Sequence, residues 1–205
     1  DIWVGTKGEG LYRLTPEGSG YRVSHFAHSD TDAYSLSDDQ IYCVEEDGAG
    51  RIWVATYGGG INLLEDPVGH RFIHAGNLMT HYPLDEAGRV RWLLYDRPDR
   101  MFAATVDGLL AFDPGASAKL MRFRLMQKIP GDAESLGNND IIHMLKDSGG
   151  RIWLATFGGG LNLIEGYDAD GAPRFRCYDK SSGLASNICM ALTLSLIHIS
   201  EPTRH

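Results

Sequence analysis

A fifteen-residue segment that recurs one hundred residues along the chain constrains the fold more than any other feature. Residues 51–65 read RIWVATYGGGINLLE, and residues 151–165 read RIWLATFGGGLNLIE. Weaker copies at residues 1–11 and 99–109 halve this period. The aromatic position of the four copies is held by Trp3, Trp53, Phe102 and Trp153, at spacings of 50, 49 and 51 residues. Such a period is typical of repeat architectures, in which each unit packs on its neighbours.

Each repeat predicts short antiparallel strands. Residues 40–46 and 52–56 are rich in β-branched and aromatic residues, and the sequence DGAG between them predicts a turn. A glycine triplet then predicts a tight connection to a third strand at 61–64. A fourth strand is expected at 71–74 or at 80–82. Successive residues of a strand point to opposite faces, and residues 52–56 are apolar at both odd and even positions. We therefore expect that strand to be buried on both faces.

Four strands in about fifty residues is the size of one propeller blade, so the fold class we predict is all-β, a partial β-propeller. The expected divisions are a part-blade at 1–34, blades at 35–82, 88–124 and 135–178, and the start of a further blade at 183–192. The residues expected to hold the repeat together are Trp3, Trp53, Phe102, Trp153, Asp47, Gly50, Asp147, Gly150, Gly59 and Gly159.

The last residues depart from the repeat. Residues 193–205 resemble translated sequencing-adaptor read-through, and we set them aside as a non-native tail. Three and a half blades do not close a ring, so we expect the chain to be a fragment of a longer propeller whose remaining blades are its first partners.

Composition excludes several classes of protein. Lys and Arg number 19 against 27 Asp and Glu, a formal charge of −8, so the basic surface that nucleic acids require is absent. No apolar run reaches the roughly 18 residues that cross a bilayer. The three cysteines form no C-x-x-C pair that would indicate zinc.

Two histidine pairs were tested as metal ligands. His70 and His74 have helical ligand spacing, but their segment predicts loop and strand. His25 and His28 form a looser group with nearby aspartates. We expect no metal, no cofactor and no catalytic residue in this segment.

Ligand-binding candidates lie where the repeats differ or expose polar groups. The residue after the strand-ending Thr varies, and Tyr57 and Phe157 are candidate aromatic platforms; the alternative is packing within the loop. Asn62 and Asn162 could bond sugar hydroxyls or neighbouring backbone. Arg89 and Arg91 could grip a uronic-acid carboxylate or form an ion-paired face.

The pattern Asp-x-x-Gly-x-Ile-Trp-x-x-Thr, followed by glycines, resembles the two-component-regulator propeller repeat. The upstream segments SLSDDQI at 35–41 and SLGNNDI at 135–141 match that repeat too, as does GLASNI at 183–188. The resemblance covers residues 1 to about 192.

This resemblance implies seven-bladed propellers in the periplasmic sensor region of hybrid two-component histidine kinases of Bacteroidetes. It implies an oligosaccharide signal, a homodimeric parent protein, and a membrane connection only through parts outside this segment. Two alternatives stay open. One is a propeller enzyme, a lyase or glycosidase, for which His143 and Glu134 are the nearest candidates. The other is a protein-interaction scaffold.

Overall fold

The computed structural model describes residues 1–66, 68 and 70–195 and places four antiparallel sheets in them. We call these sheets blades 1 to 4. Blade 1 contains β1 (Ile2–Gly5), β2 (Leu11–Glu17) and β3 (Gly20–Phe26). Blade 2 contains β4 (Ile41–Glu46), β5 (Ile52–Thr56), β6 (Ile61–Asp66) and β7 (Arg71–Ile73). Blade 3 contains β8 (Val90–Arg97), β9 (Arg100–Thr105), β10 (Leu109–Phe112) and β11 (Phe123–Met126). Blade 4 contains β12 (Ile141–Lys146), β13 (Ile152–Thr156), β14 (Leu161–Tyr167) and β15 (Pro173–Tyr178).

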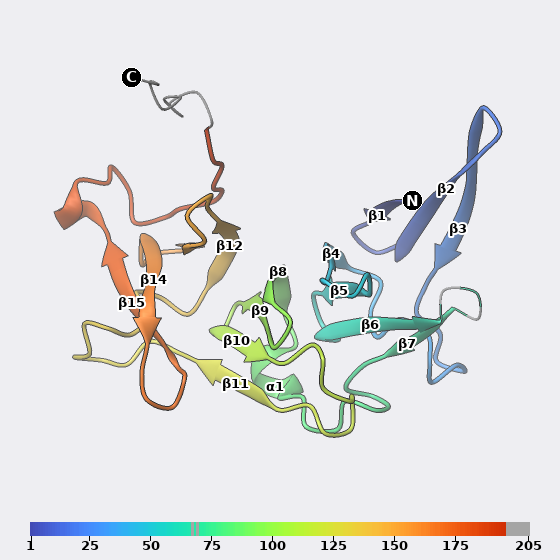
Figure 1. Cartoon of the computed structure of the whole chain (residues 1–205), viewed down its shortest axis with the longest axis horizontal. Helices are drawn as coiled ribbons and strands as arrows, with labels where there is room; N and C mark the ends of the chain where they lie inside the picture. The colour runs from blue at the N-terminus through green and yellow to red at the C-terminus, as the bar shows by residue number, and fades with distance from the viewer. Residues whose placement is uncertain (67, 69, 196–205) are drawn as a thin grey trace, which may run out of the picture.

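The blades stand side by side in an arc (Figure 1). In blades 2 to 4 the strands follow chain order across the sheet, and the first strands β4, β8 and β12 pack beside one another on the concave side. The last strands β7, β11 and β15 lie on the convex side (Figure 1). This is the arrangement of propeller blades around an axis, so the prediction of an all-β partial propeller is confirmed.

The helical content is small. A one-turn helix, α1 (Leu84–Ala87), precedes β8, and a 3₁₀ turn, η1 (Lys180–Ser182), follows β15. The fourth strand of blade 2 is at Arg71–Ile73, whereas residues 80–82 form a turn before α1. Within the described residues there is no helix of the length and apolarity that crossing a bilayer requires. Of the tail predicted at 193–205, only 193–195 fall within the described residues.

Three apolar clusters fill the spaces between neighbouring blades. The aromatic anchors of blades 1 to 3 each pack into the cluster that faces the next blade: Trp3 against Leu36 and its neighbours, Trp53 with Leu93, and Phe102 with Met144. Trp53 and Phe102 have no exposed surface. An aromatic residue therefore recurs in each repeat because this position lies in the apolar core between two blades, where a large ring fills the space.

The first strand of each of blades 2, 3 and 4, which lies on the concave side and is called the inner strand, carries one extra residue near its start. Ile41 pairs with Thr56 and Cys43 with Ala55, so Tyr42 stands between them as a β-bulge. The same shift makes Arg91 the bulge residue of β8 and Ile142 that of β12. A bulge redirects its side chain relative to the regular pleat, and it often does so beside functional sites.

Candidate functional site

At the turn between the first and second strands of blade 2, one carboxylate organises the hairpin. Asp47 Oδ2 accepts from Trp53 Nε1 at 2.8 Å and from Arg51 Nε at 2.8 Å, while Oδ1 accepts the backbone N–H groups of Ala49 and Arg51. Gly50 has φ +77°, which an L side chain rarely adopts. The turn is therefore held by a buried, fully bonded aspartate.

Blade 4 repeats this arrangement. Asp147 accepts from Trp153 Nε1 at 2.9 Å and from Arg151 Nε at 2.7 Å. These bonds, led by that of the indole, lower the pKa of Asp147 to about 2. At Asp47 burial acts in the opposite direction, but the bonds from Trp53 and Arg51 outweigh it and the pKa is again lowered. In both blades the bonds favour the anionic form of the carboxylate, which stabilises the turn.

Blade 3 has an equivalent aspartate that the sequence analysis missed. Asp96 stands four residues before Arg100 and six before Phe102, the spacing of Asp47 to Arg51 and Trp53. Arg100 Nε donates to Asp96 Oδ2 at 2.8 Å, and Lys146 Nζ of blade 4 lies 2.8 Å from Oδ1. The spacing was visible in the sequence, but Pro98 and Asp99 hid it by replacing the usual turn residues.

The other end of the blade is closed by the loop after the second strand. Thr56 Oγ1 donates to the carbonyl of Gly60 at 2.9 Å, and Thr156 does the same to Gly160 at 2.8 Å. A Cβ at Gly59 would collide with Ser37, which belongs to the lead-in segment (residues 37–40) before the inner strand. The glycines are thus needed because two backbone segments approach closely here.

Asn62 and Asn162, predicted as ligand-binding candidates, are buried with no exposed surface. Asn62 Oδ1 accepts from Ser37 N at 2.9 Å, and its Nδ2 donates to Ser37 Oγ at 2.8 Å. Asn162 Oδ1 accepts from Gly137 N at 2.8 Å. The structure therefore supports the structural alternative for both: these amides hold the lead-in segment and do not face a ligand.

The two tyrosines of blade 2 form a stacked pair beside that segment. The rings of Tyr42 and Tyr57 are 4.8 Å apart at an interplanar angle of 22°. Tyr42 is 42% exposed, and the Tyr57 N–H donates to the carbonyl of Gln40 at 3.0 Å. Tyr42 was not among the sequence candidates, although its position varies between repeats in the same way as that of Tyr57. The same argument would have found it.

Arg89 and Arg91 lie next to this pair. Arg89 pairs with Tyr57 in an isolated β-bridge, and the Arg91 guanidinium lies 5.8 Å from the Tyr57 ring centre. Arg91 forms an ion pair with Asp140 of blade 4, and Arg89 forms one with Asp107 at 3.1 Å. We call the resulting surface the rim; it consists of Tyr42, Tyr57, Arg89, Arg91, Asp107 and Asp140.

Phe157 extends this surface onto blade 4. Its N–H donates to the carbonyl of Asp140 at 2.8 Å, and its ring is 48% exposed. Its backbone forms an isolated bridge with Ile188. Of the predicted ligand-binding residues, Tyr57, Arg89 and Arg91 thus lie together. Phe157 lies beside Asp140, the ion-pair partner of Arg91. The two asparagines are buried in the interior.

The candidates for catalysis do not meet. His143 lies on the inner strand β12, where its ring packs on Trp92 at 3.9 Å between centres. Burial lowers the pKa of His143. Glu134 lies at the other side of the blade: its carbonyl accepts from Phe175 of β15, and its carboxylate pairs with Arg174 at 3.7 Å. Three strand spacings of about 4.8 Å each separate the two edges.

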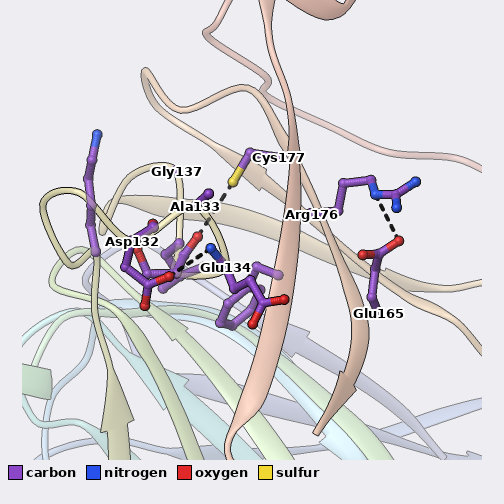
Figure 2. A pocket seen from close by; sticks show the side chains of 11 residues that line it. Asp132, Ala133, Glu134, Gly137, Glu165, Arg176 and Cys177 are labelled. Carbon is purple, nitrogen blue, oxygen red and sulfur yellow. Dashed lines mark hydrogen bonds and ion pairs between the residues drawn. The ribbon is translucent and has the colours of Figure 1, made fainter. Parts of the chain in front are cut away.

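A pocket of about 430 Å³ opens beside Glu134 at the convex edge of blade 4 (Figure 2). Figure 2 shows two of the contacts in its lining: Arg176 pairs with Glu165 at 2.8 Å, and Asp132 Oδ1 accepts from Glu134 N. Cys177 donates towards the carbonyl of Ser135 at 3.6 Å, and burial raises the pKa of its thiol.

Both histidine pairs have structural partners. His25 stacks on Tyr12 at 4.4 Å, and His28 bonds the carbonyl of Leu36 and the carboxylate of Asp30. The His70 ring packs on Phe26 at 4.4 Å, and His74 Nδ1 accepts from Gly76 N at 3.1 Å. Among the described residues there is no group of three or more His, Cys, Asp or Glu side chains placed to hold a metal ion.

Comparison with known proteins agrees with this geometry. Residues 35–58 and 135–158 match the family described as two component regulator propeller. Each segment runs from the lead-in of blade 2 or 4 to the loop after its second strand. The match falls on the two repeats in which the sequence resembles this family most clearly. A search of curated protein sequences finds no significant match.

Solved structures share the fold. The extracellular domain of a hybrid two-component system of B. thetaiotaomicron superposes with a TM-score of 0.61 at 19% identity, over 83% of this chain and 21% of that one. An extracellular domain of the same organism, described as belonging to a one-component system, gives 0.59 at 22% identity, over 80% and 22%. PorZ, a surface component of the type-IX secretion system of Porphyromonas gingivalis, gives 0.57 at 18% identity, over 84% and 25%. The chain therefore spans between a fifth and a quarter of the length of these proteins.

Proposed function

We propose that this chain, a set of two-component regulator propeller blades, belongs to the periplasmic ligand-sensing region of a two-component signalling protein. The observation that carries the proposal is the match of two blades to that family, together with the likeness to extracellular domains of two-component systems. The signal we propose is an oligosaccharide, which binds at the rim without being chemically changed.

The chemistry of the rim supports a binding role. Stacked tyrosines offer a rigid apolar face, and the neighbouring ion pairs offer hydrogen-bond donors and acceptors beside it. Aromatic faces with adjacent polar groups suit sugars, which have apolar C–H faces and polar edges. A lyase or glycosidase would need converging acid and base groups, and Glu134 and His143 stand on opposite edges of their blade.

Sensing also needs the ligand to favour one of two states of the protein. The rim joins three blades, because Arg91 of blade 3 reaches Tyr57 of blade 2 and Asp140 of blade 4. A ligand that bridges these groups would resist relative movement of the blades. We propose that the parent protein transmits this change in blade arrangement to its kinase.

The test is titration of the folded chain with a panel of oligosaccharides, followed by isothermal calorimetry and thermal melting. We expect saturable heat and a rise in Tm for at least one member, since a ligand that binds only the native state raises its stability. Tyr57→Ala should abolish both signals. Tyr21→Ala removes a tyrosine that is 55% exposed on β3 of blade 1 and should leave them unchanged. Absence of heat and of melting shifts across the whole panel would refute the proposal.

A second candidate, a surface component of a secretion machine, has the fold likeness to PorZ in its favour. The same titration separates the two. A secretion component that uses these blades as a scaffold needs no saccharide at the rim, so both the wild-type chain and Tyr57→Ala would then be silent in calorimetry.

A further inference from the structure

Resting on the proposed function, we infer that the rim selects an uncharged oligosaccharide and not a uronate-bearing or sulfated one. The ligand would lie on the Tyr42–Tyr57 pair and bond the Arg91–Asp140 pair. The sequence left two interpretations of Arg89 and Arg91 open, a grip on a uronic-acid carboxylate and an ion-paired face. The structure favours the ion-paired face, because each arginine faces an aspartate.

Each guanidinium of the rim already has a carboxylate partner. Arg91 is 18% exposed and Asp140 29% exposed, so this pair is partly withdrawn from water. Arg89 and Asp107 form the second pair at 3.1 Å. The formal charge of the rim is therefore zero, in a protein whose overall charge is −8. An anionic ligand that bonds a guanidinium of the rim would meet the aspartate beside it and would approach against the net field.

The same pairs suit hydroxyl groups. The recorded contact between Arg91 and Asp140 uses one N–H-bearing nitrogen and one carboxylate oxygen. A guanidinium has five N–H donors and a carboxylate has two acceptor oxygens, so the pair still presents both kinds of group side by side. A sugar hydroxyl both donates and accepts, and adjacent hydroxyls on a pyranose match this alternation. A carboxylate or sulfate only accepts.

The aromatic part of the rim is preorganised. Tyr42 is the bulge residue of β4, and Tyr57 is tied to the lead-in segment by its backbone bond to Gln40. Asn62 and Ser37 in turn hold that segment. In blade 4 the bulge residue is Ile142 and the loop residue is Phe157, so this end of the surface is apolar as well. The blade 4 end adds no cation for an anionic ligand. At the other end Lys7 of blade 1 forms an isolated bridge with Gln40, directly after the acidic Asp38 and Asp39.

The experiment measures binding of neutral hexasaccharides and of hexagalacturonate to the full chain by calorimetry, at two salt concentrations. We expect a neutral hexasaccharide to bind with an affinity that salt leaves unchanged, and hexagalacturonate to bind at least about tenfold more weakly. Asp140→Asn releases the Arg91 guanidinium. This variant should lose affinity for the neutral sugar and gain about tenfold for hexagalacturonate, with a new dependence on salt.

Two further variants test the location and the charge. Tyr42→Ala should weaken the neutral ligand by about tenfold or more without changing the preference for charge. Glu17→Gln makes the same change of charge as Asp140→Asn, but on the exposed end of β2 in blade 1, and should have no effect on either ligand. Circular dichroism confirms that each variant is folded.

The outcomes separate the two proposals. Tighter binding of hexagalacturonate than of any neutral sugar to the wild-type chain overturns the inference but leaves saccharide sensing intact. If neither Tyr42→Ala nor Asp140→Asn changed the affinity for the neutral hexasaccharide, the rim would not be the binding site. Absence of binding heat with every saccharide would overturn the proposed function itself.

Discussion

Blades 2 and 3 solve the same packing problem with different side chains. In blade 2 the buried carboxylate of Asp47 receives the indole N–H of Trp53 from its own sheet. In blade 3 the aromatic ring belongs to Phe102, which has no N–H, and Asp96 receives Lys146 from blade 4 instead. In both blades the arginine four residues after the aspartate forms an ion pair with it: Arg51 with Asp47, and Arg100 with Asp96.

The comparison shows which part of the motif is indispensable. A buried carboxylate at the turn must have a full set of donors, but one of them can come from the next blade. Tyr95, the residue of blade 3 that corresponds to Lys146, lies against Gly48 of the blade 2 turn, where a carboxylate already satisfied by Trp53 needs no cation. The degenerate repeat thus exchanges a donor within the blade for one between blades.

The largest expected effect comes from removing the carboxylates. Asp47→Ala and Asp96→Ala should each lower the free energy of unfolding by about 3 kcal/mol, because buried donors lose their acceptor. Urea denaturation measures both. If Asp96→Ala cost less than about 1 kcal/mol while Asp47→Ala cost 3, the two carboxylates would not be equivalent, and the comparison would fail. Asp85→Ala, on the exposed side of α1, is the control.

The same residues show which parts of the fold could be predicted from the sequence. The anchors Trp53 and Phe102 were predictable because core packing repeats at every blade. Asp96 carried the right spacing, but its proline-containing turn broke the pattern that identified Asp47. Its partner Lys146 could not be found, since it comes from a different repeat fifty residues away and only the fold brings it close.

The rim divides in a similar way. Tyr57 was selected because its position varies on a fixed loop, and it is partly exposed beside Arg89 and Arg91. The polar amide of Asn62 indicated a binding role, yet β6 is covered on both faces at this point and the amide bonds Ser37. An ion-paired face was one of the two predictions for the arginines. Arg89 finds its partner Asp107 within blade 3, whereas Asp140, the partner of Arg91, belongs to the next blade and could not be identified without the fold.

The next prediction converts the anchor of blade 2 into that of blade 3. Trp53→Phe removes the indole donor while Arg51 remains, and nothing in blade 3 takes the place of Lys146. We expect a loss of about 2 kcal/mol, from a missing bond to a charged acceptor and from lost volume in a buried site. A loss as small as that of a surface substitution would mean that Asp47 does not need the indole. The same urea titrations measure the effect.

Lys146→Met tests the donor between blades. Its side chain is 36% exposed, so solvent weakens the pair and the expected loss is about 1 kcal/mol. A double-mutant cycle with Asp96→Asn isolates the coupling, because the loss should shrink once the carboxylate is neutral. Lys119→Met is a matched surface control. An unchanged loss in the Asp96→Asn background would show that Lys146 acts through its bond to the Asp96 carbonyl or through its methylene chain, and not through the carboxylate.

The smallest effect concerns pH in blade 4. The native pKa of Asp147, about 2, lies below the unfolded value of about 3.9, so its bonds stabilise the fold above pH 4 and that contribution disappears as pH falls towards 2. Trp153→Phe removes the strongest cause of the shift. The difference in unfolding free energy between wild type and this variant should therefore be larger at pH 6 than at pH 2.5, on the order of 0.5 kcal/mol. In an Asp147→Asn background the variant should cost the same at both pH values. A difference that persisted there would assign the pH dependence to another group, and the indole would then act in blade 4 as Phe102 acts in blade 3, through packing alone.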